Sequence, residues 1–596
     1  MTSGSATRTG GTAPRLDELR AALATATRPQ ARKAVRELVL VVDGGDALTL
    51  AARYAPVADL SSDVLLRLWT EAADPDAFCA VLLAPAFRRE GRTGLRLQRR
   101  ASLTGLRHLT MLRTLHVFRC KDITDLTEVG ALTALTDLDL NGCAGIDDLS
   151  PLSGLTELVR LNLHRCRAVA DVTPLLSLGR LRELDLSMTK VTSTDGFGPA
   201  FPVLESLTLR GCRSFREARQ LAGLRRLASL DLGWTGVRDL AGLRDVPVLA
   251  RLDLRSCGQL RDLTGADALP ALTDLILDNC PRLGTLRGLG AHPRLTRLVL
   301  QTCPDLRDLT GLSPLAGLAE LAINDCERLV SLRGLGSPRT LTQLDISQCP
   351  ALEDLSGLAA LPALGRLKLH GMPQLRDLAP VAAMPVLRKL EVWSCSALTD
   401  LETLGHHDHL AYLSVGVCES FTTPGPLPGL PALEELHFCC DSLTDLGDLG
   451  GLPALRKLTV VGSGLTDLAP MAGTPLVEIG LYGVSGPTSL QVLEDCPELR
   501  ELTIYRCENA RDFAVDQLVT LSLSFLDWKD LSPLTDHPNL TTLALGVLTE
   551  LADVSALTTL PALTTLTMPR KDPRNPGRYD PVLTGLTERG VSVSYG

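Results

Sequence analysis

Cysteine is the residue type whose spacing in this sequence could most readily do chemistry. Twelve of the sixteen cysteines recur with a period of about 23 residues, at positions 120, 143, 166, 212, 257, 280, 303, 326, 349, 395, 418 and 507. Zinc sites use closely spaced ligand pairs, which this spacing does not offer. A free cysteine tolerates full burial and has a weak S–H donor. We therefore interpret these twelve as buried structural residues, whereas Cys439, beside Cys440, falls on an outward phase.

Aspartate recurs just as regularly, ahead of an L/V-x-x-L pattern or a close variant of it. A ladder of carboxylates could bind calcium or do acid–base chemistry, but calcium sites gather several oxygen ligands in one short loop. Each aspartate is instead placed to cap a single helical turn. The ladder consists of Asp125, Asp148, Asp171, Asp239, Asp262, Asp308, Asp354, Asp377, Asp400, Asp445, Asp467, Asp530 and Asp553.

Two further clusters could bind ligands. The segment GHHDHL, with His406, His407 and His409, is dense enough to bind a transition metal, and this possibility stays open. His292 and His537 hold similar places in other units, which favours a loop-filling role. The segment VVDGGDAL, which contains Asp43 and Asp46, indicates a helix end followed by a capping aspartate.

Motifs of known enzymes are missing from the sequence. It has no phosphate-binding loop of the form G-x-x-x-x-G-K-[ST], no H-E-x-x-H, no G-x-S-x-G and no C-x-x-C. We therefore predict no catalytic residue, no cofactor and no metal, and a protein that is not an enzyme. If it were an enzyme subunit or effector, its chemistry would lie in the N-terminal segment or near Cys439.

The elements that position these residues follow from the pattern L-x-x-L-x-L-x-x-C. Leu272, Leu275, Leu277 and Cys280 return 23 residues later as Leu295, Leu298, Leu300 and Cys303. In x-L-x-L-x both leucines point inward, as in a short strand, and successive strands stack about 4.8 Å apart. That spacing exceeds the roughly 3.8 Å between the Cβ atoms of a disulfide. Other residues interrupt the cysteine phase, namely Thr189, Thr235, Met372, Asp441 and Ser463.

This pattern resembles the leucine-rich repeat over about 500 residues. The D-L-S-P-L segments at 148–152 and 530–534 are similar to bacterial internalin-type repeats, and the cysteine phase is similar to arrays of actinobacterial proteins related to NOD-like receptors. The resemblance implies an α/β solenoid, with a parallel β ribbon on the concave face and short helical or 3-10 turns on the convex face. Those receptors carry an NTPase module upstream, whereas this chain has about 90 residues there and no Walker lysine.

The chain divides into four predicted segments. Residues 1–14 are expected to be a disordered tail, 15–91 an N-terminal helical cap domain, 92–569 a solenoid of about 21 repeats, and 570–596 a C-terminal loop and capping segment that ends in a strand. The N-terminus has no apolar core of a signal peptide, and no apolar run reaches the roughly 18 residues of a membrane span. We expect a cytoplasmic protein. A net charge of −9 argues against nucleic acid as a partner.

The outward strand positions predict three columns of residues on the concave face. The middle column begins His116, Asp139, Asn162, Asp185, Thr208, Asp231, Asp253, then becomes apolar at Ile276, Val299 and Ala322. Arg160, Arg210, Arg251 and Arg255 flank its acidic part and could partly neutralise it. Exposed aromatic residues are typical anchors of protein interfaces. The predicted partner-binding residues are Trp393, Tyr412, His437, Tyr482 and Tyr505 for affinity, and Asp139, Asp185, Asp231 and Asp253 for selecting a basic partner.

These observations favour non-catalytic recognition of a macromolecular partner, expected to be a protein, on the concave face. The alternative is a sensor or regulatory subunit that works with a separately encoded NTPase or effector. The repeat fixes a scaffold and leaves the outward residues free, so it leaves the ligand and the oligomeric state open.

Overall fold

The computed structural model describes residues 12–41, 45–427, 429–462, 464–484, 486, 489–507, 514–535, 537–548, 550–569 and 579–595. The chain forms two compact units. Unit 1 comprises Met1–Leu260 and Thr264–Leu272, and unit 2 comprises Arg261–Leu263 and Thr273–Gly596. The division lies inside the repeat array, so the N-terminal helices and the first repeats belong to one unit.

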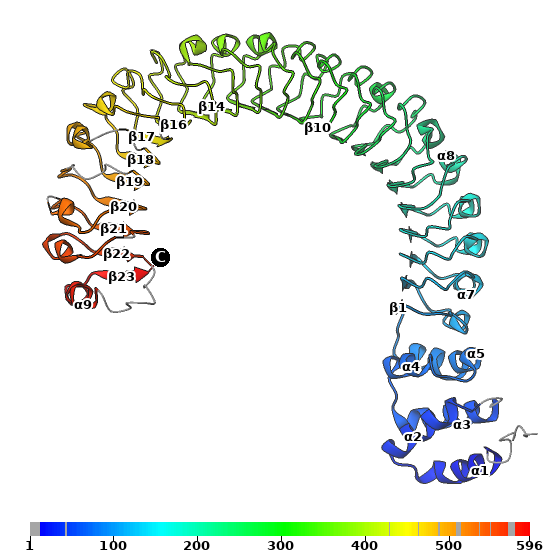
Figure 1. Ribbon diagram of the computed structural model, residues 1–596. Helices are drawn as coiled ribbons and strands as arrows, with labels where there is room; N and C mark the ends of the chain where they lie inside the picture. The colour runs from blue at the N-terminus through cyan, green and yellow to red at the C-terminus, as the bar shows by residue number, and fades with distance from the viewer. Residues whose placement is uncertain are drawn as a thin grey trace, which may run out of the picture. The chain divides into compact units, whose positions relative to one another are not determined.

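Unit 1 begins with helices that precede the repeats (Figure 1). They are α1 (Thr12–Ala22), α2 (Arg28–Val39), α3 (Gly45–Ala58), α4 (Ser62–Leu68), α5 (Pro75–Phe78) and α6 (Ala84–Arg89), with short turns η1 (Leu23–Thr25) and η2 (Cys79–Leu83) between them. Helix α1 starts inside the segment predicted as a tail. Asp46 lies in the first turn of α3, close to its predicted capping place, and Asp43 lies outside the described residues.

The helices cover the first repeat through Trp69 and Arg100. The indole Nε1 of Trp69 donates a hydrogen bond to the carbonyl oxygen of Thr104 at 3.1 Å, and the Arg100 guanidinium lies 4.8 Å from the Trp69 ring centre. Arg100 occupies the cysteine phase of this first unit, and its backbone amide lies 3.1 Å from the Sγ of Cys120. The helical segment thus caps the solenoid, as the sequence predicts.

The repeats of unit 1 contribute one short strand each to a parallel ladder, with helical turns on the opposite side (Figure 1). The strands are β1 (Gly94–Gln98), β2 (Thr114–Phe118), β3 (Asp137–Asp139), β4 (Arg160–Asn162), β5 (Glu183–Asp185), β6 (Ser206–Thr208), β7 (Ser229–Asp231) and β8 (Arg251–Asp253). The turns are η3 (Leu106–His108), α7 (Thr127–Gly130), η4 (Ser150–Gly154), η5 (Thr173–Ser177), α8 (Phe197–Ala200), η6 (Ala218–Leu221) and η7 (Ala266–Ala268).

Unit 2 continues the same construction, again with parallel neighbours. Its strands are β9 (Asp274–Asp278), β10 (Arg297–Gln301), β11 (Glu320–Asn324), β12 (Gln343–Ser347), β13 (Arg366–His370), β14 (Lys389–Trp393), β15 (Tyr412–Gly416), β16 (Glu435–Cys439), β17 (Lys457–Val461), β18 (Glu478–Tyr482), β19 (Glu501–Tyr505), β20 (Thr520–Ser524), β21 (Thr542–Leu545), β22 (Thr565–Met568) and β23 (Ser592–Tyr595). Its turns are η8 (Ser356–Ala360), η9 (Ala379–Val381), η10 (Glu402–Leu404), η11 (Ala469–Met471), η12 (Gln491–Asp495), η13 (Ser532–Leu534), η14 (Ser555–Thr559) and the helix α9 (Asp580–Glu588).

Leucine fills the interior between the strands and the turns. In β9, Leu275 and Leu277 are buried, whereas Asp274, Ile276 and Asp278 alternate with them on the outside. Every strand of five residues between β9 and β14 shows this alternation, as the predicted period of two requires. Each buried leucine stabilises the fold by about 1.5–3 kcal/mol through removal of apolar surface from water.

The twelve periodic cysteines are all buried, which confirms their predicted structural role, and all sixteen thiols are free. The thiol of Cys143 lies 3.3 Å from the Val117 carbonyl oxygen of the preceding strand, and the thiol of Cys166 lies 3.2 Å from that of Leu140. Burial raises the pKa of both thiols to about 12. These two thiols therefore serve as buried partners for carbonyl groups of the preceding repeat.

The unit that contains β16 differs from the sequence-based assignment. Asp441 was expected at the cysteine phase, but Cys440 occupies that place: it is buried, and its thiol faces the Val415 carbonyl oxygen 25 residues earlier instead of the usual 26. This unit is one residue shorter after its strand, which a fixed period could not reveal. Cys439 is half-buried at the end of β16, as its outward phase predicts. Ser463 lies outside the described residues.

The recurring aspartates cap the turns on the side opposite the strands. Asp148 Oδ1 accepts a hydrogen bond from the Ser150 amide at 2.8 Å, just where η4 begins. The same bond to the amide two residues later recurs in both units, which confirms the capping role where it is observed. It is made by Asp125, Asp171, Asp239, Asp308, Asp354, Asp377, Asp400, Asp445, Asp467, Asp530 and Asp553.

The histidines ahead of the strands fill loops. His292, His407 and His537 are buried. The two ring nitrogens of His407 lie 3.2 Å and 3.1 Å from the carbonyl oxygens of Met384 and Leu404. Burial lowers the pKa of His407, against the effect of the two backbone carbonyl groups. His406 is exposed and pairs with Asp408 at 2.8 Å. In the predicted histidine cluster, His407 therefore lies in the interior and His406 lies on the surface.

The last strand, β23, pairs with β22 in parallel, where the sequence predicts a strand. Helix α9, which was not predicted, precedes it, and Arg589 after this helix donates to the Leu560 carbonyl oxygen at 2.8 Å. These contacts close the end of the array. The predicted basic loop falls largely on residues 570–578, outside the described residues. In the part of the chain that is described, no helix combines the length and apolar character needed to cross a membrane.

Candidate binding surface

The outward side chains of the strands form a continuous surface in each unit, which we call the strand face. The register of the ladder places equivalent residues side by side, so each outward position becomes a column. In unit 1 the middle column of the strand face is Arg96, His116, Asp139, Asn162, Asp185, Thr208, Asp231 and Asp253. From His116 onward this is the predicted column, in the predicted order.

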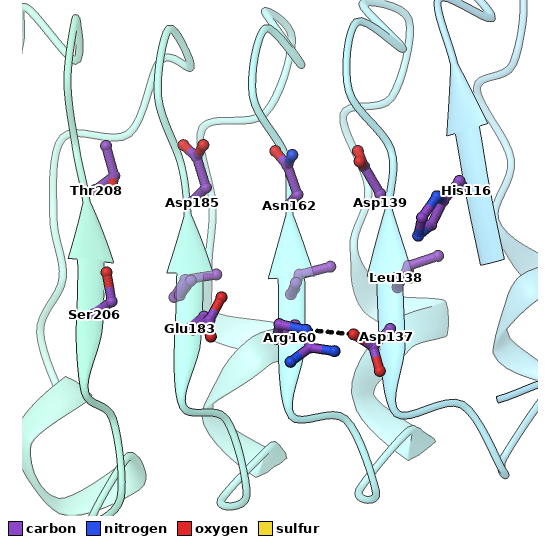
Figure 2. A pocket seen from close by; sticks show the side chains of 12 residues that line it. His116, Asp137, Leu138, Asp139, Arg160, Asn162, Glu183, Asp185, Ser206 and Thr208 are labelled. Carbon is purple, nitrogen blue, oxygen red and sulfur yellow. Dashed lines mark hydrogen bonds and ion pairs between the residues drawn. The ribbon is translucent and has the colours of Figure 1, made fainter. Parts of the chain in front are cut away.

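A shallow acidic depression lies on strands β2 to β6 of unit 1 (Figure 2). We call it the acidic patch. Its cavity volume is about 350 Å³, and it is lined by His116, Asp137, Leu138, Asp139, Arg160, Leu161, Asn162, Glu183, Leu184, Asp185, Ser206 and Thr208. Figure 2 shows Asp139, Asn162 and Asp185 side by side on successive strands, with the Asp137–Arg160 ion pair below them.

Three of the middle-column carboxylates each accept a hydrogen bond from a backbone amide. One oxygen of Asp139 accepts the Asn141 amide at 2.9 Å, and one oxygen of Asp185 accepts the Ser187 amide at 2.8 Å. Asp231 does the same with Gly233 at 2.8 Å. These bonds fix the orientation of the three side chains, and the second oxygen of Asp139 and of Asp185 faces the acidic patch.

Arginines partly neutralise this column, as the sequence predicts. Arg210 lies 3.8 Å from Asp231, with its guanidinium 4.1 Å from the centre of the Trp234 ring. Asp253 is only 4% exposed, and its carboxylate is held by Arg255 at 2.8 Å. Asp253 therefore presents little charge to a partner, which leaves Asp139, Asp185 and Asp231 as the accessible acidic residues of the predicted set.

Two of these aspartates have altered acidity. Burial raises the pKa of Asp139 and of Asp231, against the effect of the backbone amide that each one accepts. A nearby charge adds to the shift in both cases, from Asp185 and Asp253 respectively. Both groups therefore take up protons at a higher pH than an ordinary aspartate.

In unit 2 the predicted aromatic residues gather into two blocks on the strand face. The first block comprises Trp393 on β14, Tyr412 on β15 and His437 on β16. The Tyr412 and His437 rings are 5.0 Å apart, and the Lys389 amine lies 3.9 Å from the Tyr412 ring centre. Trp393 covers Gly416 on the next strand, and its Nε1 donates to the Ser414 hydroxyl at 3.2 Å.

The second block contains Tyr482, Tyr505 and Phe525. The Tyr482 and Tyr505 rings are 6.1 Å apart, and the Phe525 ring is 4.9 Å from that of Tyr505. The guanidinium of Arg506 lies 4.9 Å from the Phe525 ring centre. Phe525 is 40% exposed and was not predicted as a binding residue.

Sequence reasoning missed a fourth outward column, which Phe525 exemplifies. It is formed by the residue just before the cysteine phase, and we call it the edge column. Its backbone is left-handed, and its larger side chains, such as Arg99, Trp234 and Phe525, are exposed beyond the ends of the strands. In unit 1 it includes Arg99, Arg119, Gly142, Arg165, Met188, Gly211, Trp234 and Ser256, and in unit 2 Asn279, Thr302, Asp325, Gln348, Gly371, Ser394, Val417, Gly483, Arg506 and Phe525. The sequence did contain a signal for the edge column, because its residue directly precedes each periodic cysteine.

The surface offers contacts for recognition. Within the described residues, no three histidine, cysteine, aspartate or glutamate side chains are grouped so that they could hold a metal ion. The features that stand out are rigid carboxylates in unit 1 and clustered rings in unit 2. Carboxylates select basic groups, and partly exposed rings supply apolar contact area.

No protein-family model matches the chain, and no curated protein matches it. Among solved structures, internalin C2 from Listeria monocytogenes is 22% identical, covers 36% of this chain and 90% of that chain, and gives a TM-score of 0.29. The TLR13–ssRNA13 complex is 19% identical over 78% of this chain and 77% of that chain, with a TM-score of 0.33. The mouse RP105/MD-1 complex is 17% identical over 80% and 78%, with a TM-score of 0.39.

The class of the fold rests on this chain's own repeat. Parallel strands of x-L-x-L-x, a buried residue that satisfies the following turn, and a capped helical turn on the other side recur through both units. The protein is a leucine-rich-repeat solenoid with an N-terminal helical cap.

Proposed function

We propose that the chain is a non-catalytic recognition protein whose strand face binds a protein partner. The observation that carries this proposal is the concentration of scarce aromatic residues on that face. Aromatic residues make up 3% of the chain, yet Tyr412, Tyr482 and Tyr505, three of its six tyrosines, lie on the strand face of unit 2, as does Trp393.

The first aromatic block is suited to act as an anchor. Tyr412 and His437 support each other, and Trp393 is held by its hydrogen bond to Ser414. Rings that are already ordered lose little conformational freedom when a partner covers them. Tryptophan and tyrosine are also the residues most enriched among those that dominate interface affinity.

The acidic patch supplies a second contact, with a different effect. Asp139 and Asp185 of the patch, with Asp231 beyond it on β7, present carboxylates from fixed positions, so they favour lysine or arginine groups of a partner and repel acidic ones. Charges of this kind act mainly on the association rate and on the choice of partner. The chain's net charge of −9 likewise favours a basic partner.

The test compares partner capture by the full chain and by a Trp393→Ala/Tyr412→Ala double variant. Proteins captured from the source cells are identified by mass spectrometry, and the affinity of the purified candidate is then measured for both forms. Loss of two anchors is expected to weaken binding by about 30-fold or more. Circular dichroism checks that the double variant is folded.

Val330→Ala is the matched control, because Val330 is 46% exposed but lies outside the strands. It should bind as the unchanged chain does. A partner that binds the double variant with unaltered affinity would remove the aromatic block from the proposal.

A further inference from the structure

Unit 1 contains a second cavity, which the proposed function does not use. It lies where the strands β1 to β4 end, has a volume of about 360 Å³, and four of its seven lining residues are Arg96, Arg99, Arg119 and Arg165. All seven lie in the described part of the chain, and none of them is acidic. This basic cavity lies at the end of the strands, whereas the acidic patch lies along them.

The four guanidinium groups are free to bind an anion. Among the described residues, no ion pair involves any of them, in contrast to Arg160 and Arg255 nearby, which pair with Asp137 and Asp253. All four side chains are exposed. Unpaired arginines that converge on one cavity repel each other, and a bound anion relieves that repulsion.

The repeat architecture explains why the arginines surround a hollow. Arg99, Arg119 and Arg165 occupy the edge column of β1, β2 and β4, with left-handed φ values of 50°, 52° and 60°. Gly142 holds the same position after β3, so no side chain fills the space between Arg119 and Arg165. With one strand skipped, these two backbones are about 10 Å apart.

The fourth arginine is held in place by an aromatic ring. The Arg96 guanidinium lies 4.6 Å from the centre of the Phe118 ring, a cation–π contact that orders the side chain. The Asn141 amide also lines the cavity, beside the acidic middle column. The cavity thus offers guanidinium forks and an amide around a space that carries no opposing charge of its own.

We propose that this arginine cavity binds a compact polyphosphate anion, such as a pyrophosphate group. Guanidinium forks match phosphate oxygens in a two-pronged geometry. A volume near 360 Å³ is at the small end of ligand pockets and is more than a single orthophosphate fills. Four arginines balance the several negative charges of linked phosphates, whereas the single carboxylates of an acidic peptide are spread along a chain.

The test titrates inorganic pyrophosphate into the full chain at low ionic strength and measures binding by isothermal titration calorimetry. One saturable site is expected, with affinity that falls as salt is added. An Arg99→Gln/Arg119→Gln/Arg165→Gln triple variant should bind at least tenfold more weakly. Pyrophosphate should also raise the melting temperature of the unchanged chain more than that of this variant.

A second triple variant, Arg213→Gln/Arg225→Gln/Arg226→Gln, is the matched control. These three arginines are exposed, belong to unit 1 and lie outside the cavity, so net charge changes equally while the site stays intact. Retained binding in the control supports the proposal. Three results would overturn it: no detectable pyrophosphate binding, equal loss in both triple variants, or displacement by sulfate at the same concentration. If the first triple variant does not fold, Arg165→Gln alone should still weaken binding severalfold.

Discussion

At the scale of single residues, the buried position after each strand is defined by what it must satisfy. Cysteine fills it most often, but Thr189 and Thr235 take the same place, and the Thr189 hydroxyl donates to the Leu186 carbonyl oxygen at 2.7 Å. Both residue types are small and provide one donor for a buried carbonyl group. The position therefore favours a compact donor but does not require one, because Met372 is buried at the same phase without a donor.

Substitutions at Cys303 test this requirement. Cys303→Ala leaves a void and removes the thiol that faces the Leu277 carbonyl oxygen at 3.4 Å. It should cost about 1 kcal/mol and lower the melting temperature. Cys303→Thr keeps a donor and should lower it less, as measured by calorimetry. A threonine variant that melts below the alanine variant would show that size, and not hydrogen bonding, governs the position.

Most of the buried positions could be predicted from the sequence, because buried residues follow the repeat period. The inward leucines, the buried thiols and the loop-filling His292, His407 and His537 all lie where the repeat predicts. The place of Cys440 was missed because the position was counted forward from the strand, although the leucine spacing shortens there and Leu443 follows Cys440 at the usual distance. The burial of Asp253 against Arg255 depends on a side-chain pairing that no spacing reveals.

At the scale of elements, each repeat's strand and helical turn have at most five residues, so neither is stable alone. The turns depend on their capping aspartates: Asp354 Oδ1 accepts the Ser356 amide at 2.9 Å where η8 begins. Bonds from the Ser356 hydroxyl and amide hold the pKa of Asp354 below its usual value. The carboxylate therefore stabilises the folded state only while it is ionised.

Asp354→Ala should lower the melting temperature at pH 7, by no more than about 2 °C because the group is exposed to solvent. The folded pKa is depressed, so the stabilisation is complete above the unfolded value of about 3.9 and is lost as pH falls through the folded value. The difference from the unchanged chain should thus shrink in acid.

Asp354→Asn keeps an acceptor oxygen that does not titrate, and it serves as the control for that measurement. Thermal melts of the three proteins at a series of pH values measure these differences in melting temperature. A difference between the alanine variant and the unchanged chain that widens below pH 4 would contradict the capping role.

At the scale of the whole molecule, the repeats contact mainly their neighbours, so stability accumulates unit by unit. The strands from β9 to β16 pair residue for residue with the next repeat, as Leu298 pairs with Leu321. The repeat pattern was sufficient to predict this architecture. It did not predict α9, which belongs to no repeat.

Removal of one whole repeat tests that additivity. Deletion of residues 303–325 joins Thr302 to Cys326 and leaves the leucine phase unchanged, so the chain should remain folded and melt only a few degrees lower. Deletion of 303–314 removes about half a repeat, shifts the phase and should disrupt the ladder. Circular dichroism and thermal melts compare the two, and equal damage from both would contradict independent repeats.

The left-handed edge column has a consequence for how such a chain can diversify. Its backbone geometry is the same whether the residue is glycine, arginine, methionine, tryptophan, threonine, valine or phenylalanine, although this geometry strains every residue except glycine. Exchange of one non-glycine residue for another therefore keeps the scaffold and changes mainly what this rim of the strand face can contact. An array built this way can acquire a new specificity one rim position at a time, while its interior stays under unchanged selection.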